Sequence, residues 1–317
     1  MFSHLYNSFV KPYYPECEDY AERVLAVHSQ GRDVYGYFTV AKRIWTFLDN
    51  QEPIGFTVTT EKRGGSIKFG PSVLAVPNRG HGLGLAFRLL VETHYSEARK
   101  YYNTLPEENA SALKYVVKAG YRVEAHLQKQ YRIQHGELVV GKIVRTTSLQ
   151  HPAITIADMT SERLQLVDGE NLSFGELRSA IVHLLSPWYD DIDDGFVEGV
   201  RSGMESGSDL SKKAKRVMVG YRSGIPTGIV VATPKRGGSL KCSPLIVARQ
   251  DTESVRQLIE SALLCFPDGQ HRKVYSHIPL SAPWLIEGLS RLGFKPEGVL
   301  REPYKAGVDM IVFAKML

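Results

Sequence analysis

The chain repeats itself at a fixed spacing, and this repeat constrains its fold more than any other feature. Residues 51–71 return at 224–244, and both segments contain Lys-Arg-Gly-Gly-Ser, so that Lys62 corresponds to Lys235. This repeat spacing, from Lys62 to Lys235, also relates other pairs along the chain: Gly55 and Gly228, Pro71 and Pro244, and Gly120 and Gly293. Such a unit is too long for a solenoid repeat, so we predict two copies of one domain, at residues 1–148 and 149–317.

Length and composition agree with two globular domains. The 317 residues make a chain about twice as long as a typical domain, and a hydrophobic content of 43% provides a core for each half. No apolar run approaches the length of a membrane span, and Met1–Tyr14 lacks the apolar core of a signal peptide, which predicts a cytoplasmic protein. Cys17, Cys242 and Cys265 lie far apart and the histidines show no ligand spacing, so neither a disulfide nor a metal site is expected.

Each half is predicted to alternate strands with helices in the same order. β-Branched and aromatic residues mark the strands, Gly64-Gly65 marks a hairpin turn, and Gly120 marks the end of a helix. In the first half we expect strands at Ile44–Leu48, Gly55–Thr60, Ile67–Val76, Tyr101–Thr104, Tyr121–Ile133 and Leu138–Val144, and helices at Gly84–Lys100 and Asn109–Ala119. The stretch Arg145–Pro152 is the predicted linker between the halves.

A glycine-rich turn in the first half carries the most specific chemical signal. An apolar strand ends near Val76, the segment Arg79-Gly-His-Gly82-Leu-Gly84 follows, and an amphipathic helix begins. Glycines let a ligand approach the backbone, and the unpaired amides and dipole of a helix N-terminus attract a pyrophosphate. A dinucleotide-binding fingerprint would place this turn after the first strand, whereas here it is predicted to follow the fourth strand of its half.

The Arg-x-x-Gly-x-Gly pattern resembles the pyrophosphate loop of the GNAT superfamily of acyltransferases. A second stretch, with Asn109, Ala112, Tyr115, Gly120 and Tyr121 in step, is similar to the later helix of that family. The resemblance covers the first half through its strand order and the second half through the repeat. It implies an α/β (α+β) fold in which each domain is a mixed, mostly antiparallel, splayed sheet flanked by helices, and it implies acetyl-CoA as the acyl donor.

The resemblance also implies how acetyl-CoA is held. The pantetheine arm would pair with the backbone of one strand at Leu74, Ala75 and Val76. The pyrophosphate would lie on amides of the loop, which are those of Arg79, Gly80, His81, Gly82, Leu83 and Gly84. Asn109 and Tyr115 would flank the pantetheine and the thiol end.

The catalytic acid is less well marked. The family's acid tyrosine stands seven residues after the asparagine, where this chain has Val116. At about 100° per residue, the sixth position, Tyr115, faces about 120° away from the asparagine. Tyr115 is therefore either the acid or a residue that packs against the donor, and Tyr102 and Tyr121 are the alternative phenols.

Two carboxylates precede the same helix. Glu107 and Glu108 follow Pro106, near where an acceptor amine would enter under the resemblance. Either could act as a base through a water molecule. Alternatively, both complement the positive N-terminal end of the helix that begins near Asn109.

The second half departs from the loop pattern. At the repeat spacing, the counterparts of Arg79, Gly82 and Gly84 are Thr252, Val255 and Gln257. Asp251 and Glu253 would add negative charge where a pyrophosphate would lie. We predict a second domain that has the fold and lacks the pyrophosphate loop.

Together these inferences predict an acetyl-CoA-dependent N-acetyltransferase. The acceptor stays open among a small amine, an amino acid or aminoacyl group, and a peptide N-terminus, because this fold serves many amines. One alternative is a CoA-binding sensor or scaffold without transfer. Another is acetylation of an aminoacyl-tRNA, held by a basic chain with a net charge of +5.

Overall fold

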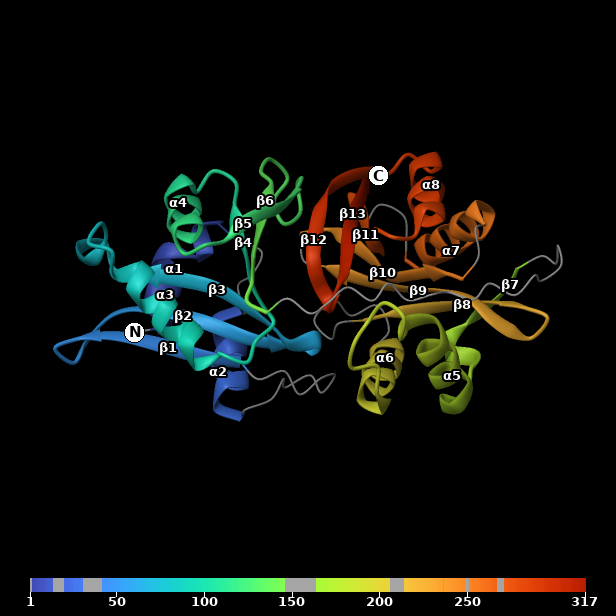
Figure 1. Ribbon diagram of the computed structural model, residues 1–317, viewed down its shortest axis with the longest axis horizontal. Helices are drawn as coiled ribbons and strands as arrows, with labels where there is room; N and C mark the ends of the chain where they lie inside the picture. Colours follow the sequence, from blue (N-terminus) through green and yellow to red (C-terminus); the bar gives the residue numbers. More distant parts are fainter. Residues whose placement is uncertain are drawn as a thin grey trace. The chain divides into compact units, whose positions relative to one another are not determined.

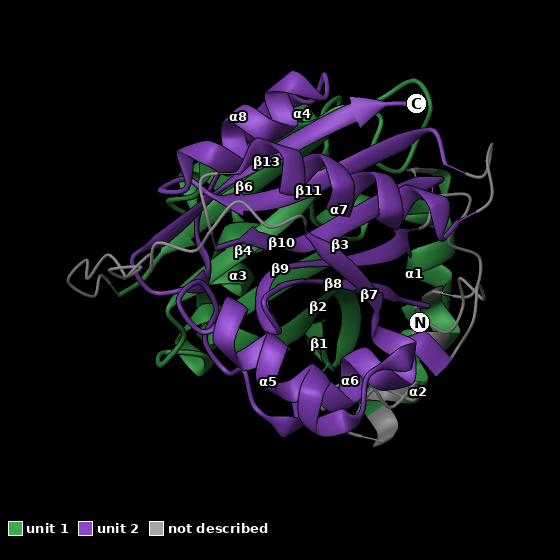
Figure 2. Ribbon diagram, turned by 90° about the vertical axis from the view of Figure 1, so that its right-hand side faces the viewer, with its two compact units in different colours: residues 1–146 green, residues 147–317 purple. Residues whose placement is uncertain are grey.

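The computed structural model describes residues 2–13, 20–30, 42–145, 164–205, 214–235, 237–248, 251–266 and 271–317. The chain divides into two compact units, Met1–Thr146 and Thr147–Leu317, which Figure 2 shows in different colours. Most of the predicted linker Arg145–Pro152, together with Cys17, lies outside the described residues. No helix in the described ranges combines the length and apolar content needed to cross a bilayer.

Unit 1 is a mixed sheet with helices on both faces. Its described elements are, in chain order, α1 (Phe2–Phe9), α2 (Tyr20–Gln30), β1 (Lys42–Asp49), β2 (Glu52–Lys62), β3 (Ser66–Leu74), α3 (Leu83–His94), β4 (Lys100–Pro106), α4 (Ala110–Lys118), β5 (Arg122–Leu127) and β6 (Glu137–Ile143). The strands lie in the order β1-β2-β3-β4-β6-β5 (Figure 1). The β3–β4 pair is parallel and the other neighbours are antiparallel, which confirms the predicted mixed, mostly antiparallel sheet.

Two hydrophobic cores cover the two faces of this sheet. In one, Tyr6 of α1 and side chains of α2 pack against Phe56 of β2. In the other, Val91 of α3 and Val116 of α4 pack against Phe69 of β3. Along β3, Phe69 and Val73 have the same parity yet lie in different cores, because Gly70 and Pro71 form a bulge between them. Because α3 and α4 share a face, the loop before α3 and the side chains of α4 meet near the end of β3.

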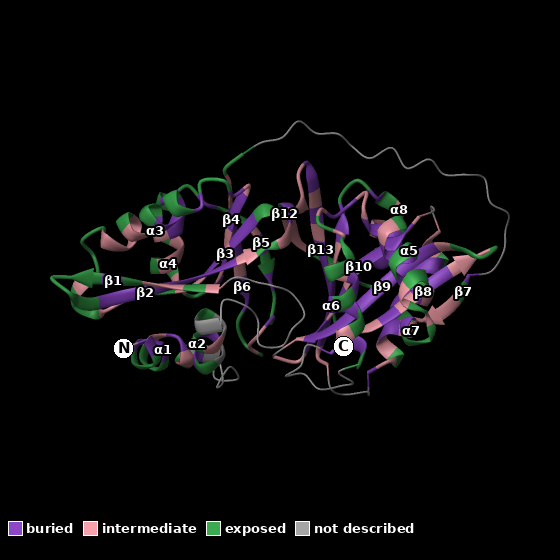
Figure 3. Cartoon of the chain, turned by 90° about the horizontal axis from the view of Figure 1, so that it is seen from below, coloured by how far each residue is buried: buried purple, intermediate pink, exposed green. Residues whose placement is uncertain are grey.

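Unit 2 has the same arrangement with one additional strand. Its described elements are β7 (Gln165–Asp168), α5 (Phe174–Leu185), α6 (Asp194–Glu205), β8 (Arg216–Arg222), β9 (Ile225–Lys235), β10 (Ser239–Val247), α7 (Thr252–Leu264), β11 (Lys273–Pro279), α8 (Pro283–Arg291), β12 (Lys295–Lys305) and β13 (Val308–Met316). The strand order is β7-β8-β9-β10-β11-β13-β12, and the β10–β11 pair is the parallel one. Helices α5 and α6 lie on one side of these strands and α7 and α8 on the other (Figure 1). The central strands β9 and β10 are almost entirely buried (Figure 3).

The repeat spacing carries elements of unit 1 onto elements of unit 2. It maps β2, β3, β4 and α4 onto β9, β10, β11 and α8, with both ends of each element in register. The hairpin turns are held alike, since Arg99 Nε donates to Gly64 O at 2.9 Å and Arg272 Nε donates to Gly237 O at 2.6 Å. Among the described residues of unit 1, the strand before the glycine loop is the third, whereas the sequence predicted the fourth.

Several predicted boundaries were wrong. Strand β3 ends at Leu74, because Val76–Asn78 forms a 3₁₀ turn that contains a proline. The predicted helix to Lys100 ends at His94, and the predicted strand to Ile133 ends at Leu127, where turns follow. Helices α1, α2, α5 and α6 are absent from the predicted order. The α1 sequence, rich in aromatic residues with Ser and Asn, has weak intrinsic helix propensity and is stabilised by its core contacts instead.

Candidate functional site

The sheet of unit 1 opens between β3 and β4. The two strands pair up to Phe69 and Asn103 and not beyond. At this point β3 bulges, since Gly70 and Pro71 stand opposite a single residue of β2. Gly70 has φ of 137°, and a Cβ there would lie 3.0 Å from Asn103 Oδ1, so glycine suits this crowded corner. Beyond the bulge β3 pairs with β2 alone, which leaves one strand edge available to an extended ligand.

The end of β3 contains the residues predicted to pair with the pantetheine arm. The Ala75 N–H donates to Ile54 O at 2.8 Å and therefore faces β2. Since neighbouring residues alternate in direction, the N–H and C=O of Leu74 face the open edge. Arg79 Nε donates to Leu74 O at 2.9 Å, and Val76 is exposed in the 3₁₀ turn. Of the three residues predicted to pair with the pantetheine arm, Leu74 is thus the one whose backbone faces the opening. A ligand that bound to Leu74 O would displace the Arg79 side chain from it.

The loop between β3 and α3 presents backbone amides to solvent. Gly80 and Gly82 have φ of 89° and 80°, and a Cβ at either would meet no atom within 4 Å. Gly82 is the N-cap of α3, with no side-chain cap and no acidic residue in the first turn. Within the described chain, no backbone acceptor takes the amides of Leu83 and Gly84. Unpaired amides, the helix dipole and the exposed residues 79–82 together suit a pyrophosphate.

Helix α4 turns Tyr115 toward this loop. A Cβ on Gly84 would lie 3.7 Å from the Tyr115 ring, so the ring packs against the first turn of α3. Burial raises the pKa of Tyr115, and the Arg88 guanidinium opposes that shift. Val116, at the family's acid position, is buried in the core. Asn109 is the N-cap of α4, and its side chain accepts a hydrogen bond from Ala112 N at 3.0 Å. Its predicted contact with acetyl-CoA would therefore use the part of the side-chain amide that this hydrogen bond leaves open.

The alternative phenols differ in their surroundings. Tyr121 is buried, and its hydroxyl donates to Glu92 Oε1 at 2.7 Å. Burial is the main cause that raises the pKa of Tyr121 well above its usual range. Tyr102 is half-buried on β4. A buried hydroxyl already bound to a carboxylate is a poor proton donor to a ligand, whereas the Tyr115 ring packs against Gly84 in the first turn of α3.

Glu107 and Glu108 are held by the segment between β5 and β6. Glu107 accepts from Gly136 N at 2.6 Å and contacts His126 Nε2 at 2.5 Å. Glu108 forms a two-pronged ion pair with Arg132. These partners lower the pKa of both carboxyls, the Gly136 amide being the main cause for Glu107 and Arg132 for Glu108. Both are weaker bases than an isolated glutamate, and the predicted basic role requires the ligand to alter these contacts.

Sequence reasoning missed a buried ionic network between helix α3 and strand β6. Arg88 Nε donates to Glu92 Oε1 at 3.2 Å, and Lys142 Nζ donates to Glu92 Oε2 at 2.6 Å. Arg88 is 1% exposed and Glu92 6% exposed, although both lie on α3. The sequence signal for this network is an arginine and a glutamate four residues apart among the apolar positions of one predicted helix. A buried ion pair of this kind is uncommon without further partners.

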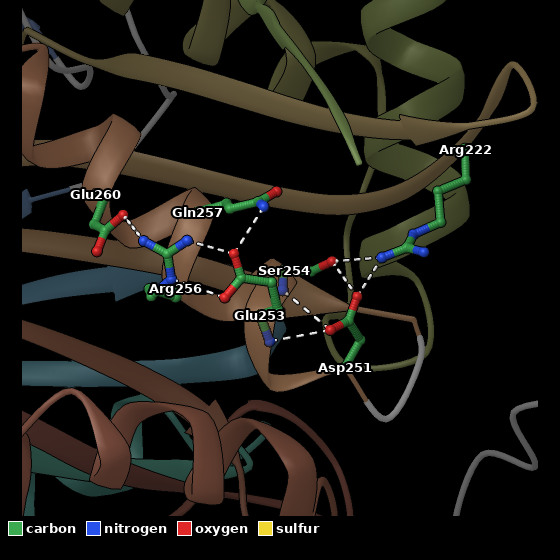
Figure 4. A network of polar contacts seen from close by, with 7 residues as sticks. All are labelled: Arg222, Asp251, Glu253, Ser254, Arg256, Gln257 and Glu260. Carbon is green, nitrogen blue, oxygen red and sulfur yellow. Dashed lines mark hydrogen bonds and ion pairs between the residues drawn. The ribbon is translucent and has the colours of Figure 1, made fainter. Parts of the chain in front are cut away.

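In unit 2 the corresponding helix terminus is closed by its own side chains (Figure 4). Asp251 is the N-cap of α7, and its Oδ1 accepts from Glu253 N at 3.0 Å and Ser254 N at 3.3 Å. Its Oδ2 accepts from Ser254 Oγ at 2.5 Å and pairs with Arg222. The amides that α3 leaves open are thus satisfied in α7 by a carboxylate, which would also repel a phosphate.

The two units place the larger side chain on opposite members of the packed helix pair. In unit 1 the Tyr115 ring of α4 packs on Gly84 of α3. In unit 2 Val255 of α7 is fully buried, and a Cβ on Gly288 of α8 would lie 2.8 Å from it. Packing therefore aligns Val255 with Gly84, not with Gly82 as the repeat spacing predicts. The reason is the connection before the helix, which spans residues 75–82 in unit 1 and only 248–251 in unit 2.

Asp251→Ala is expected to destabilise unit 2 without creating a second ligand site. Loss of an N-cap carboxylate costs about 1–2 kcal/mol of unfolding free energy, which urea denaturation measures. The short connection still lacks glycines, so calorimetry should show the same acetyl-CoA stoichiometry as in the parent. A second acetyl-CoA site in Asp251→Ala would contradict the view that the shorter connection closes this helix.

Comparisons with known proteins give structural similarities only. No protein family matches the sequence, and no curated protein matches it. The ribosomal-protein-S18-alanine N-acetyltransferase from Escherichia coli has 11% identity, a TM-score of 0.31, and a match covering 34% of this chain and 72% of that chain. The Salmonella typhimurium acetyltransferase that modifies the N-terminal serine of ribosomal protein L7/L12 has 12% identity, a TM-score of 0.35, and coverage of 41% and 75%. A putative streptothricin acetyltransferase from Bacillus anthracis, in complex with acetyl coenzyme A, has 15% identity, a TM-score of 0.31, and coverage of 32% and 62%.

Proposed function

We propose that this chain is an acetyl-CoA-dependent N-acetyltransferase of the GNAT type, with its donor site in residues 1–148. The observation that carries the proposal is the open strand edge at Leu74 beside an uncapped helix N-terminus at Gly82. An extended amide-containing arm that ends in a pyrophosphate needs these two features side by side. Residues 149–317 form the domain without a pyrophosphate loop, which supports the first domain or contributes to acceptor binding.

The residues of unit 1 fit such a donor. The amides from Arg79 to Gly84 would hold the pyrophosphate, and the Leu74 backbone would pair with the pantetheine amides. Bound acetyl-CoA supplies an activated thioester carbonyl. The protein positions an amine against it, and Tyr115 is the proposed proton donor to the leaving sulfur.

One observation favours the alternative of a CoA-binding sensor. Glu107 and Glu108 are both paired and their pKa values are lowered, so neither of the two predicted bases is a strong carboxylate base. A screen of amine acceptors with detection of free thiol separates the two functions. The acceptors to include are small amines, amino acids, peptide N-termini and aminoacyl-tRNA. Thiol release with any of them supports transfer, whereas binding of acetyl-CoA without release from any acceptor supports the sensor.

One acetyl-CoA is expected to bind per chain. Only α3 combines a glycine loop with open amides among the described helices, since the first turn of α7 is capped by Asp251. Isothermal titration calorimetry of the full chain gives the stoichiometry directly. Two equivalent sites would show that unit 2 binds the donor as well, and would contradict the assignment of a single pyrophosphate loop.

A further inference from the structure

Arg88 is a charged side chain enclosed by the core of unit 1. It is 1% exposed, on the second turn of α3. Its guanidinium carbon lies 3.4 Å from the centre of the Phe69 ring and 4.5 Å from that of Tyr121. Its Nε donates to Glu92 Oε1 at 3.2 Å and to Tyr121 OH at 3.1 Å. The guanidinium therefore packs on two aromatic rings, and its Nε edge is held by the Glu92 carboxylate and the Tyr121 hydroxyl.

The other edge is unsatisfied. Both Nη1 and Nη2 of Arg88 are buried and have no hydrogen-bond partner within the described part of the chain. A buried donor without an acceptor is costly, and more so when it is charged. Glu92, the carboxylate paired with Arg88, already accepts from Tyr121 and Lys142. A buried guanidinium in this state is suited to stabilising a negative charge that forms beside it.

The position of Arg88 identifies where that charge would form. Phe69, on which the guanidinium lies, is the last residue of β3 that pairs with β4, so Arg88 marks the base of the opening. Arg88 follows Gly84 by four residues on α3, so the two residues share one face of that helix. The Arg88 guanidinium also opposes the rise that burial causes in the pKa of Tyr115. The Tyr115 ring in turn packs against Gly84 of the loop helix. Arg88 thus lies behind the phenol that faces the proposed donor site.

The second unit shows that this network is not needed for the fold. The buried pair Lys100–Glu124 (2.7 Å) recurs as Lys273–Glu297 (2.8 Å), so unit 2 keeps a buried ion pair that the fold uses. The Arg88 network does not recur. Its counterparts at the repeat spacing are Ser261 for Arg88, Cys265 for Glu92, Gly288 for Tyr115 and Phe294 for Tyr121.

The shorter connection in unit 2 does not change this conclusion. Tyr95 and Phe266 are both buried, and each donates its N–H to a carbonyl three residues back, which aligns the ends of α3 and α7 by packing. In that alignment Arg88 takes the place of Ile259, which is buried and apolar. Under either alignment the charged network belongs to the unit that has the glycine loop.

We propose that Arg88 is a positioning residue that orients Tyr115 and stabilises its phenolate during acyl transfer. The inference rests on the proposed function. The amine nitrogen bonds to the thioester carbonyl carbon, the carbon–sulfur bond breaks, and its electron pair goes to sulfur. The Tyr115 proton then passes to the sulfur, and Arg88 faces the resulting phenolate. The amine gives up its proton to water, and Tyr115 regains a proton from solvent.

The experiment compares Arg88→Met, Arg88→Lys, Tyr115→Phe and the double variant Arg88→Met/Tyr115→Phe in the full chain. Arg88→Met is expected to lower kcat for thiol release by about thirtyfold, with the KM for acetyl-CoA within about threefold of the parent. Arg88→Lys should retain part of the rate because it keeps the charge. The double variant should be no slower than Tyr115→Phe, because both changes affect one proton transfer.

A second measurement does not depend on turnover. In protein labelled with fluorotyrosine, the fluorine resonance of residue 115 is assigned by its loss in Tyr115→Phe, and its titration is followed with pH. Arg88 favours the phenolate, so Arg88→Met should move this titration to higher pH. Lys142→Met is the matched control, because it removes another partner of Glu92 without removing the charge behind Tyr115.

The outcomes separate this inference from the proposed function. A parent protein that does not bind acetyl-CoA refutes the proposed function and the inference with it. A parent protein that binds acetyl-CoA but releases no thiol with any acceptor refutes both as well, because there is then no transfer for Arg88 to assist. Binding that is intact, with Arg88→Met unchanged in kcat and in the Tyr115 titration, overturns the inference alone. So does a double variant whose loss is the product of the two single losses, because Arg88 would then act independently of Tyr115.

Discussion

A Gly82→Asp variant is expected to fold and to bind acetyl-CoA about a hundredfold more weakly than the parent, a loss of about 3 kcal/mol. Gly82 is the N-cap of α3 with φ of 80°, and a Cβ there meets no atom within 4 Å. Aspartate tolerates left-handed backbone better than most residues and is a preferred N-cap. Its carboxylate would take the amides that a pyrophosphate needs and would repel it, as Asp251 is positioned to do in unit 2.

Gly82→Asn is the matched control for this variant. Asparagine has nearly the same shape and the same backbone tolerance, but it carries no charge. Its expected loss of affinity is smaller, about tenfold, because it competes for the amides without repelling the ligand. Melting temperatures of both variants should stay close to that of the parent. Unchanged acetyl-CoA affinity in a folded Gly82→Asp protein would remove the α3 N-terminus from the binding site.

Glu124→Gln is expected to cost about 3–5 kcal/mol of unfolding free energy, because it leaves the buried Lys100 ammonium without its carboxylate. Lys100 Nζ lies 2.9 and 2.7 Å from the two Glu124 oxygens, and the side chains are 2% and 4% exposed. Urea denaturation of the parent and the variant gives the difference. Glu297→Gln should have a similar effect in unit 2, where the pair with Lys273 has the same geometry.

The double variant Lys100→Met/Glu124→Leu tests the cause. Replacing both charges by apolar groups of similar size removes the desolvation cost together with the attraction, so most of the lost stability should return. If Glu124→Gln lowers stability by less than about 1 kcal/mol, the pair behaves like an exposed salt bridge and its burial has little energetic effect.

Much of the fold follows from local patterns that tertiary contacts do not override. The hairpin at Gly64-Gly65 and the helix end at Gly120 were correctly predicted, because left-handed backbone strongly favours glycine. Helices α1 and α5 were not, since their stability comes from core packing and, for α5, from a Ser173–Glu176 capping box that was overlooked. The end of β3 was placed too late, because an apolar run does not reveal where pairing stops.

The candidate site was predictable only where a backbone requirement shows in the sequence. Glycines with positive φ mark the loop at Gly80 and Gly82. The partners of Glu107 and Glu108 come from the distant β5–β6 segment, so no local pattern shows that both carboxylates are paired. Arg88 looks like an ordinary surface residue of an amphipathic helix until the fold buries it. The roles assigned to these residues remain predictions.

The unequal connections before α3 and α7 have a consequence for protein engineering. Point substitutions change side chains, but they cannot lengthen residues 248–251 to match residues 75–82. A donor site in unit 2 would need an insertion ahead of α7, a compensating deletion after it, and a smaller residue than Val255 to make room for an aromatic ring at Gly288. No single step among these confers binding, so random mutagenesis offers no gradual route to it. Grafting the whole segment from Ala75 to Arg99 in place of Ala248–Arg272 preserves the strand register on both sides, and is the direct way to attempt a two-site protein.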